Sequence, residues 1–101
     1  MSTILLVDDE RDILLALRIY LLPQGYEILL AENGRQALQI LRERKIDLIL
    51  LDIMMPEMDG IQTVREIRSF CNVPVIFLSA KGEEEDKIAG LEAGADDYIT
   101  K

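Results

Sequence analysis

Short runs of aliphatic residues alternate along the chain with segments whose apolar residues recur every three or four positions. The aliphatic runs include TILLV, DLILL and PVIFL, which are apolar on both faces, as parallel strands covered by helices on each side are. The segments between them predict amphipathic helices. The predicted strands are residues 3–7, 26–31, 47–51, 74–78 and 98–100, and the predicted helices are residues 11–22, 33–44, 61–69 and 83–93.

Strict alternation of strand and helix predicts an α/β fold with a doubly wound parallel sheet. We expect the flavodoxin-like strand order 2-1-3-4-5, and if the first and third strands are neighbours in this way, their carboxyl ends meet where the order reverses. The length of 101 residues fits one compact domain, which we assign to residues 1–101.

The predicted topology leaves one face of the sheet poorly covered. Right-handed crossovers place the first helix on one face and the other three helices on the opposite face. One helix does not cover five strands, yet the third and fourth strands are apolar on both sides. We therefore expect the domain to be C-terminally incomplete, with a final helix missing after Lys101. The uncovered face would favour a homodimer or a non-native association.

Composition excludes several functional classes. The chain has 19 acidic and 11 basic residues, a net charge of −8, and no basic cluster of the kind that nucleic-acid binding requires. The N-terminus MSTILLVDDE lacks the basic start of a signal peptide, and no apolar run approaches the roughly 18 residues of a membrane span. We expect a cytoplasmic protein that does not itself contact nucleic acid or membrane.

The chain contains no histidine and one cysteine, Cys71. It therefore has no Ser-His or Cys-His catalytic pair, no imidazole-bound zinc and no intrachain disulfide. Chemistry must come from carboxylates, hydroxyls and lysines.

Polar residues follow the predicted strands at the edge where ligands bind in open α/β sheets. The first strand leads into Asp8 and Asp9, and the third leads into Asp52. Three carboxylates this near to one another repel strongly. Mg²⁺, which prefers oxygen ligands, would compensate their negative charge. Ser79 and Lys101 end the fourth and fifth strands and would suit a phosphate group.

A structural explanation competes with this one, because aspartate is also a favoured helix cap. Capping accounts poorly for a double aspartate after one strand and a third after another, although Asp9 or Glu10 could also cap the first helix. The chain contains neither GxGxxG nor GxxxxGK[ST], so it lacks the usual signatures of nucleotide binding.

The chain resembles the receiver domains of bacterial two-component response regulators along essentially its whole length. Four segments carry the resemblance: ILLVDDE at 4–10, LDIMMPEMDG at 51–60, PVIFLSAK at 74–81 and GLEAGADDYITK at 90–101. The last segment is most similar to receivers that precede winged-helix DNA-binding domains. The resemblance implies that a sensor histidine kinase is the partner and that a DNA-binding output domain lies outside this chain.

The resemblance also implies roles for individual residues. Asp52 would accept the phosphoryl group, and Asp8, Asp9 and Asp52 would hold Mg²⁺ together with the backbone carbonyl of Met54. Ser79 would be the switch hydroxyl that moves onto the phosphoryl oxygens. Lys101 would form an ion pair with those oxygens. Tyr98 would be the aromatic switch residue.

Two other functions stay open at this point. A small Mg²⁺-dependent phosphohydrolase would also use Asp52, but such enzymes commonly carry a second acid two residues later, where this chain has Met54. A degenerate receiver that only binds partners would not need the acidic pair, the acceptor, the hydroxyl and the lysine together.

Overall fold

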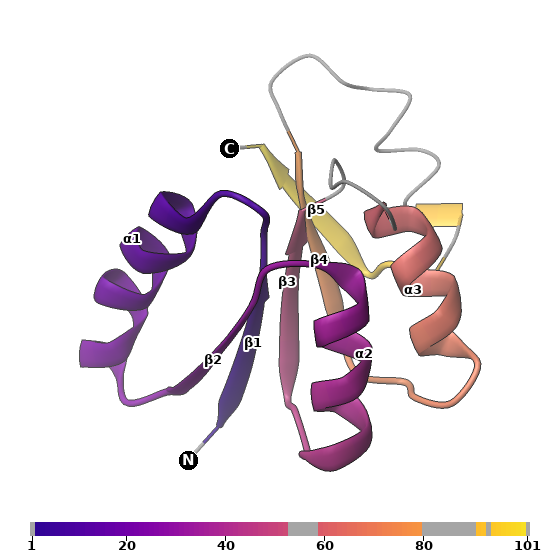
Figure 1. Ribbon diagram of the computed structural model, residues 1–101, viewed down its shortest axis with the longest axis horizontal. Helices are drawn as coiled ribbons and strands as arrows, with labels where there is room; N and C mark the ends of the chain where they lie inside the picture. Colours follow the sequence, from indigo (N-terminus) through magenta and orange to yellow (C-terminus); the bar gives the residue numbers. More distant parts are fainter. Residues whose placement is uncertain (1, 53–58, 80–90, 93, 101) are drawn as a thin grey trace.

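Five strands form one parallel sheet in the order β2-β1-β3-β4-β5, which confirms the predicted flavodoxin-like topology (Figure 1). The computed structural model describes residues 2–52, 59–79, 91–92 and 94–100. The strands are β1 (Thr3–Val7), β2 (Glu27–Ala31), β3 (Leu48–Asp52), β4 (Val75–Ser79) and β5 (Asp97–Thr100). The helices are α1 (Arg11–Leu21), the short 3-10 helix η1 (Leu22–Gln24), α2 (Gly34–Glu43) and α3 (Gly60–Arg68).

Element boundaries differ from the predicted ones by a residue or two. The third and fourth strands each start and end one residue later than predicted, so Asp52 and Ser79 are the last residues of β3 and β4. The first helix ends at Leu21, and a 3-10 turn containing Pro23 leads to Gly25, whose φ of 92° is left-handed. Glycine adopts that conformation without a Cβ penalty, which explains why the 3-10 turn ends at this residue.

The two faces of the sheet carry separate cores. In Figure 1, α1 lies on one side of the sheet, and α2 and α3 lie on the other. Successive strand residues alternate between the faces, so Leu5 packs toward α2 and α3 while Leu6 packs with Leu14 of α1. The larger core, on the side of α2 and α3, has these buried members: Leu5, Val7, Ala31, Ala37, Leu38, Ile46, Ile49, Leu51, Val64, Ile67, Val73, Val75 and Phe77.

The face that carries α1 is covered unevenly. Leu48, Leu50 and Ile76 are only partly buried there, and Ile99 on β5 is 51% exposed. Of the helices in the described ranges, α1 alone lies on this face, and it contacts β1 and β2. The predicted placement of the first three helices is thus confirmed. Association through this face stays a prediction.

Most of the helix predicted over residues 83–93 lies outside the described residues. Within that range the structure describes Leu91 and Glu92, and both are helical. Gly94, predicted to close it, has a φ of 121°, and its N–H donates to the carbonyl of Leu91. No helix in the described part of the chain is both long and apolar enough to cross a membrane.

Candidate functional site

Two buried carboxylates lie side by side at the carboxyl edge of the sheet. The register of β1 on β3 pairs Val7 with Leu51, and the next residues of the two chains are Asp8 and Asp52. Neighbouring strands are about 4.8 Å apart, so these two aspartates start from adjacent backbone positions. Asp8 is fully buried, and Asp52 is 3% exposed. The parallel topology therefore brings together two of the carboxylates predicted for the site.

The acidic turn after β1 gathers three carboxylates. One oxygen each from Asp8, Asp9 and Glu10 lies within 4.8 Å of the others, which is close enough for a single cation to bind them. Asp9 and Glu10 are exposed, whereas Asp8 is buried. The structure thus adds Glu10 to the predicted pair, because the turn brings consecutive side chains to one place.

Hydrogen bonding explains why this turn has its shape. Oδ1 of Asp8 accepts the backbone N–H of Glu10 at 2.9 Å, as is typical of aspartate in a tight turn. Glu10 occupies the N-cap position of α1, but its side chain makes no capping hydrogen bond. Capping by Glu10, considered from the sequence, is therefore wrong. The side-chain hydrogen bond in this turn is made instead by Asp8, which accepts the N–H of Glu10 itself.

The neighbouring strand ends continue the same edge, at the top of the sheet in Figure 1. Asp52 pairs with Leu78 in the register of β3 on β4, so Ser79 stands one residue further along. Ser79 in turn pairs with Thr100, the last residue of β5. For Ser79 and Tyr98 only the backbone is described, while Met54 and Lys101 lie outside the described residues. Their predicted roles stay predictions.

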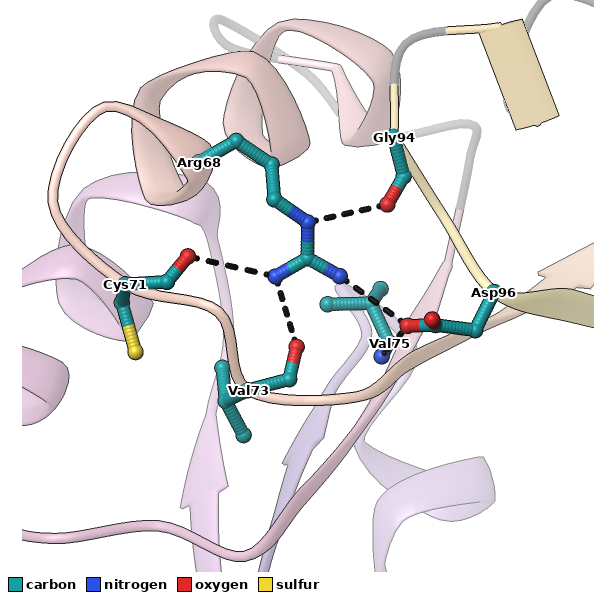
Figure 2. Close-up of polar contacts among 6 residues, drawn as sticks. All are labelled: Arg68, Cys71, Val73, Val75, Gly94 and Asp96. Carbon is teal, nitrogen blue, oxygen red and sulfur yellow. Dashed lines mark hydrogen bonds and ion pairs between the residues drawn. The ribbon is translucent and has the colours of Figure 1, made fainter.

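The sequence analysis did not single out Arg68, whose guanidinium group binds the segment that leads into β5 (Figure 2). A signal for it existed. Val64 and Ile67 are buried, and Arg68 continues their face of α3 at the helical spacing of three to four residues. A charged residue in that position must find partners, and here it finds several.

Comparison with known proteins identifies the fold and the family. The family model described as "Response regulator receiver domain" matches residues 4–101. A response regulator receiver domain from Francisella superposes with a TM-score of 0.92 at 36% identity, covering 100% of this chain and 84% of that one. The response regulator TrrA of Thermotoga maritima, solved in complex with Mg²⁺-BeF, gives a TM-score of 0.89 at 38% identity, covering 100% of this chain and 87% of that one.

Two groups of longer proteins are also similar. The transcriptional regulatory protein CpxR of Klebsiella pneumoniae is 48% identical over 101 residues, which are 100% of this chain and 43% of that protein. The transcriptional regulatory protein SrrA of Staphylococcus aureus is 48% identical over 100 residues, 99% of this chain and 42% of that protein. The chain therefore spans less than half the length of these relatives.

The family match covers both of the buried strand-end aspartates and, apart from Thr3, all residues of the five strands. It supports the resemblance drawn from the four sequence motifs and does not favour a phosphohydrolase. The chain belongs to the response regulator receiver domain family.

Proposed function

We propose that this chain is the phosphoacceptor switch of a two-component system and that Asp52 is the acceptor. The observation that carries the proposal is the position of Asp52. It ends the central strand β3, is almost fully buried, and stands beside Asp8 at the edge where the acidic turn lies. Because β3 is hydrogen-bonded to β1 and β4 on its two sides, this carboxylate is held on a rigid support.

The proposed reaction transfers a phosphoryl group from a histidine nitrogen to a carboxylate oxygen. A carboxylate oxygen of Asp52 attacks the phosphorus of a phosphohistidine on a sensor kinase, so that an O–P bond forms as the N–P bond breaks. The electron pair of the broken bond stays on the imidazole nitrogen, which then takes up a proton. Receiving the group from a partner is consistent with this chain having no histidine of its own.

Mg²⁺ is the metal that suits the acidic edge. Asp8, Asp9 and Asp52 would hold it with the backbone carbonyl of Met54, and Glu10 is near enough to Asp8 and Asp9 to take part. The donor set fits, because clustered carboxylate oxygens are the ligands that a hard divalent cation prefers. When bound, the metal would neutralise charge on the phosphoryl oxygens.

The remaining roles rest on the motifs that the chain shares with its family. Lys101 would pair with the phosphoryl oxygens, and the hydroxyl of Ser79 would move onto them, with Tyr98 turning as Ser79 moves. Phosphorylation would thereby shift the domain between two conformations, a local change of charge with a wider effect. The backbone register supports this arrangement, since it sets Ser79 one residue beyond Leu78, the partner of Asp52.

The partners follow from the same assignment. A sensor histidine kinase supplies the phosphoryl group. Transcriptional output belongs to a DNA-binding domain outside this chain, as the longer transcriptional regulators among its relatives suggest. The net charge of −8 agrees with DNA binding lying elsewhere. We propose that this phosphoryl transfer takes place in the cytoplasm.

Incubation with phosphoramidate tests the proposal, because its N–P bond imitates phosphohistidine. Intact-mass spectrometry should show one phosphoryl group added to the wild type in the presence of Mg²⁺. The Asp52→Asn variant should show none. Continuous release of inorganic phosphate from many phosphoesters would instead indicate a hydrolase, and an unmodified wild type would indicate a receiver that acts by binding alone.

A further inference from the structure

The guanidinium group of Arg68 connects three segments at the amino ends of β4 and β5 (Figure 2). Its Nε donates to the carbonyl of Gly94 at 2.9 Å. Its Nη1 donates to the carbonyls of Val73 at 2.6 Å and Cys71 at 3.3 Å, and its Nη2 donates to Oδ2 of Asp96 at 3.0 Å. One side chain from the end of α3 thus binds both the segment that enters β4 and the segment that enters β5.

Asp96 is the residue that immediately precedes β5, and it is bound to β4 in two ways. Its backbone N–H donates to the carbonyl of Val75, and its Oδ2 accepts the N–H of Val75 at 2.8 Å. The same oxygen accepts the hydrogen bond from Arg68. The position of Asp96 relative to Val75 is therefore fixed by a reciprocal pair of bonds, and Arg68 orients the carboxylate that makes one of them.

The same arrangement occurs a second time in the sheet. Asp47 immediately precedes β3, its N–H donates to the carbonyl of Thr3, and its Oδ2 accepts the N–H of Thr3 at 2.7 Å. The two sites differ in what surrounds the following strand. The central strand β3 is paired on both sides, whereas β5 is an edge strand of four residues with β4 as its one neighbour.

A short edge strand with one neighbour is the part of a sheet whose register is least determined. A slip of one residue would move every residue of β5 by about 3.3 Å and turn each side chain to the other face. The observed register pairs Phe77 with Tyr98 and Ser79 with Thr100. It therefore decides which residues of β5 reach the carboxyl edge, where Lys101 follows Thr100 in the sequence.

We propose that Arg68 is a positioning residue for the phosphoacceptor reaction, which it serves by fixing the register of β5 on β4 through Asp96 and Gly94. The inference rests on the proposed function, in that it takes Lys101 to act on the phosphoryl group. Arg68 binds the segment before the amino end of β5, whereas Asp52 lies at the carboxyl edge of the sheet. Arg68 therefore touches no reacting atom. Arginine suits the task because its planar fork reaches several oxygens at once, which lysine does not.

A double-mutant cycle of Arg68 and Lys101 tests whether Arg68 affects the rate of phosphorylation through Lys101. The Arg68→Gln variant should be phosphorylated by phosphoramidate about 10- to 100-fold more slowly than the wild type, since a misplacement of about 1 Å can slow a reaction by on the order of 100-fold. The Arg68→Lys variant should also be slow. In a Lys101→Ala background, Arg68→Gln should slow the reaction no further, because the group it positions is already gone. An equal slowing in both backgrounds, or a wild-type rate for Arg68→Gln, would overturn the proposal.

A matched control comes from the same helix. Arg65 is exposed and makes no hydrogen bond or ion pair with the residues that the structure describes. The Arg65→Gln variant changes the net charge as Arg68→Gln does, and it should keep the wild-type rate. A rate as low as that of Arg68→Gln would show that charge alone is responsible, which contradicts a positioning role.

The register itself is measured without phosphorylation. Nuclear Overhauser contacts between β4 and β5 should match the pairs Phe77–Tyr98 and Leu78–Ile99 in the wild type. They should weaken or shift in Arg68→Gln, while the contacts between β1 and β3 stay unchanged. If Arg68→Gln does not fold, the milder Asp96→Asn variant takes its place. An unphosphorylated wild type would refute the proposed function alone, whereas an unchanged β5 register in the variant refutes the role of Arg68.

Discussion

Asp8 and Asp52 stand next to one another at the carboxyl ends of β1 and β3, each one residue beyond the paired residues Val7 and Leu51. Both are buried, and Asp8 also belongs to a group of three carboxylates within 4.8 Å. Negative charges so close together oppose folding when no cation is present. The site is thus arranged to bind a cation, and this arrangement lowers the stability of the folded protein when the cation is absent.

Removing one of these charges should reverse the balance. The Asp8→Asn variant keeps an oxygen that can accept the N–H of Glu10, so the turn is preserved. Without Mg²⁺ we expect its free energy of unfolding to exceed that of the wild type by about 1 kcal/mol. Added Mg²⁺ should raise the Tm of the wild type much more than that of the variant. Calorimetric melting at several Mg²⁺ concentrations measures both effects.

Asp12 provides the control for that prediction. It is an exposed acid in the first turn of α1, where a negative charge interacts favourably with the helix dipole. Asp12→Asn should therefore not stabilise the protein, and it should leave the response to Mg²⁺ unchanged. A gain in stability equal to that of Asp8→Asn would mean that net charge, and not the cluster, is responsible.

The uneven cover of the two sheet faces predicts unequal costs of truncation. Phe77 on β4 is fully buried in the larger core, whereas Ile99 on the adjacent strand is 51% exposed. Phe77→Ala should cost about 3–5 kcal/mol of stability through lost burial and the cavity it leaves. Ile99→Ala should cost less than about 1 kcal/mol. Urea unfolding followed by circular dichroism measures both, and similar costs would contradict the described burial.

Two glycines with left-handed backbones should respond differently to substitution. Gly25 and Gly94 have φ values of 92° and 121°, so alanine at either position should cost about 1 kcal/mol in backbone strain. A Cβ on Gly25 would meet nothing within 4 Å, whereas one on Gly94 would lie 3.0 Å from Cγ of Arg68. Gly94→Ala should therefore lower the Tm more than Gly25→Ala. The reverse order would show that Arg68 does not pack against this glycine.

The helix N-termini give a further comparison. The side chains of Asn33 and Asp59 accept the N–H groups of Gln36 and Gln62, at 2.9 and 2.8 Å. Asn33→Ala and Asp59→Ala should each cost about 1 kcal/mol in urea unfolding. Glu10 makes no such bond at the start of α1, so Glu10→Ala should bring no loss of this kind. A loss as large as that of Asn33→Ala would indicate a capping role for Glu10.

Much of the fold and part of the site could be predicted from the sequence for a physical reason. Aliphatic runs apolar on both faces fit parallel strands, and parallel strands place their carboxyl ends at one edge. That reasoning predicted the parallel sheet and, together with the flavodoxin-like strand order, the neighbourhood of Asp8 and Asp52. The strand pairing confirms the order, and the register confirms the neighbourhood.

Other features depend on tertiary contacts that local patterns do not encode. The place of Glu10 in the acidic cluster follows from the turn that Asp8 stabilises. Two of the partners of Arg68, Gly94 and Asp96, lie 26 and 28 residues away along the chain. An arginine in the last turn of a helix is ordinarily explained by the helix dipole, as Arg65 is. Arg68 differs from Arg65 only in lying on the face of α3 that carries the buried residues Val64 and Ile67.

The most direct test of the central claim locates the phosphoryl group. After reaction with phosphoramidate and Mg²⁺, borohydride reduction converts an aspartyl phosphate to homoserine, and tandem mass spectrometry of the peptides identifies its position. We predict homoserine at position 52 and unmodified aspartate at positions 8 and 9. Homoserine at position 8 or 9, or a phosphoryl group recovered on a serine or threonine, would contradict the assignment of Asp52 as the acceptor.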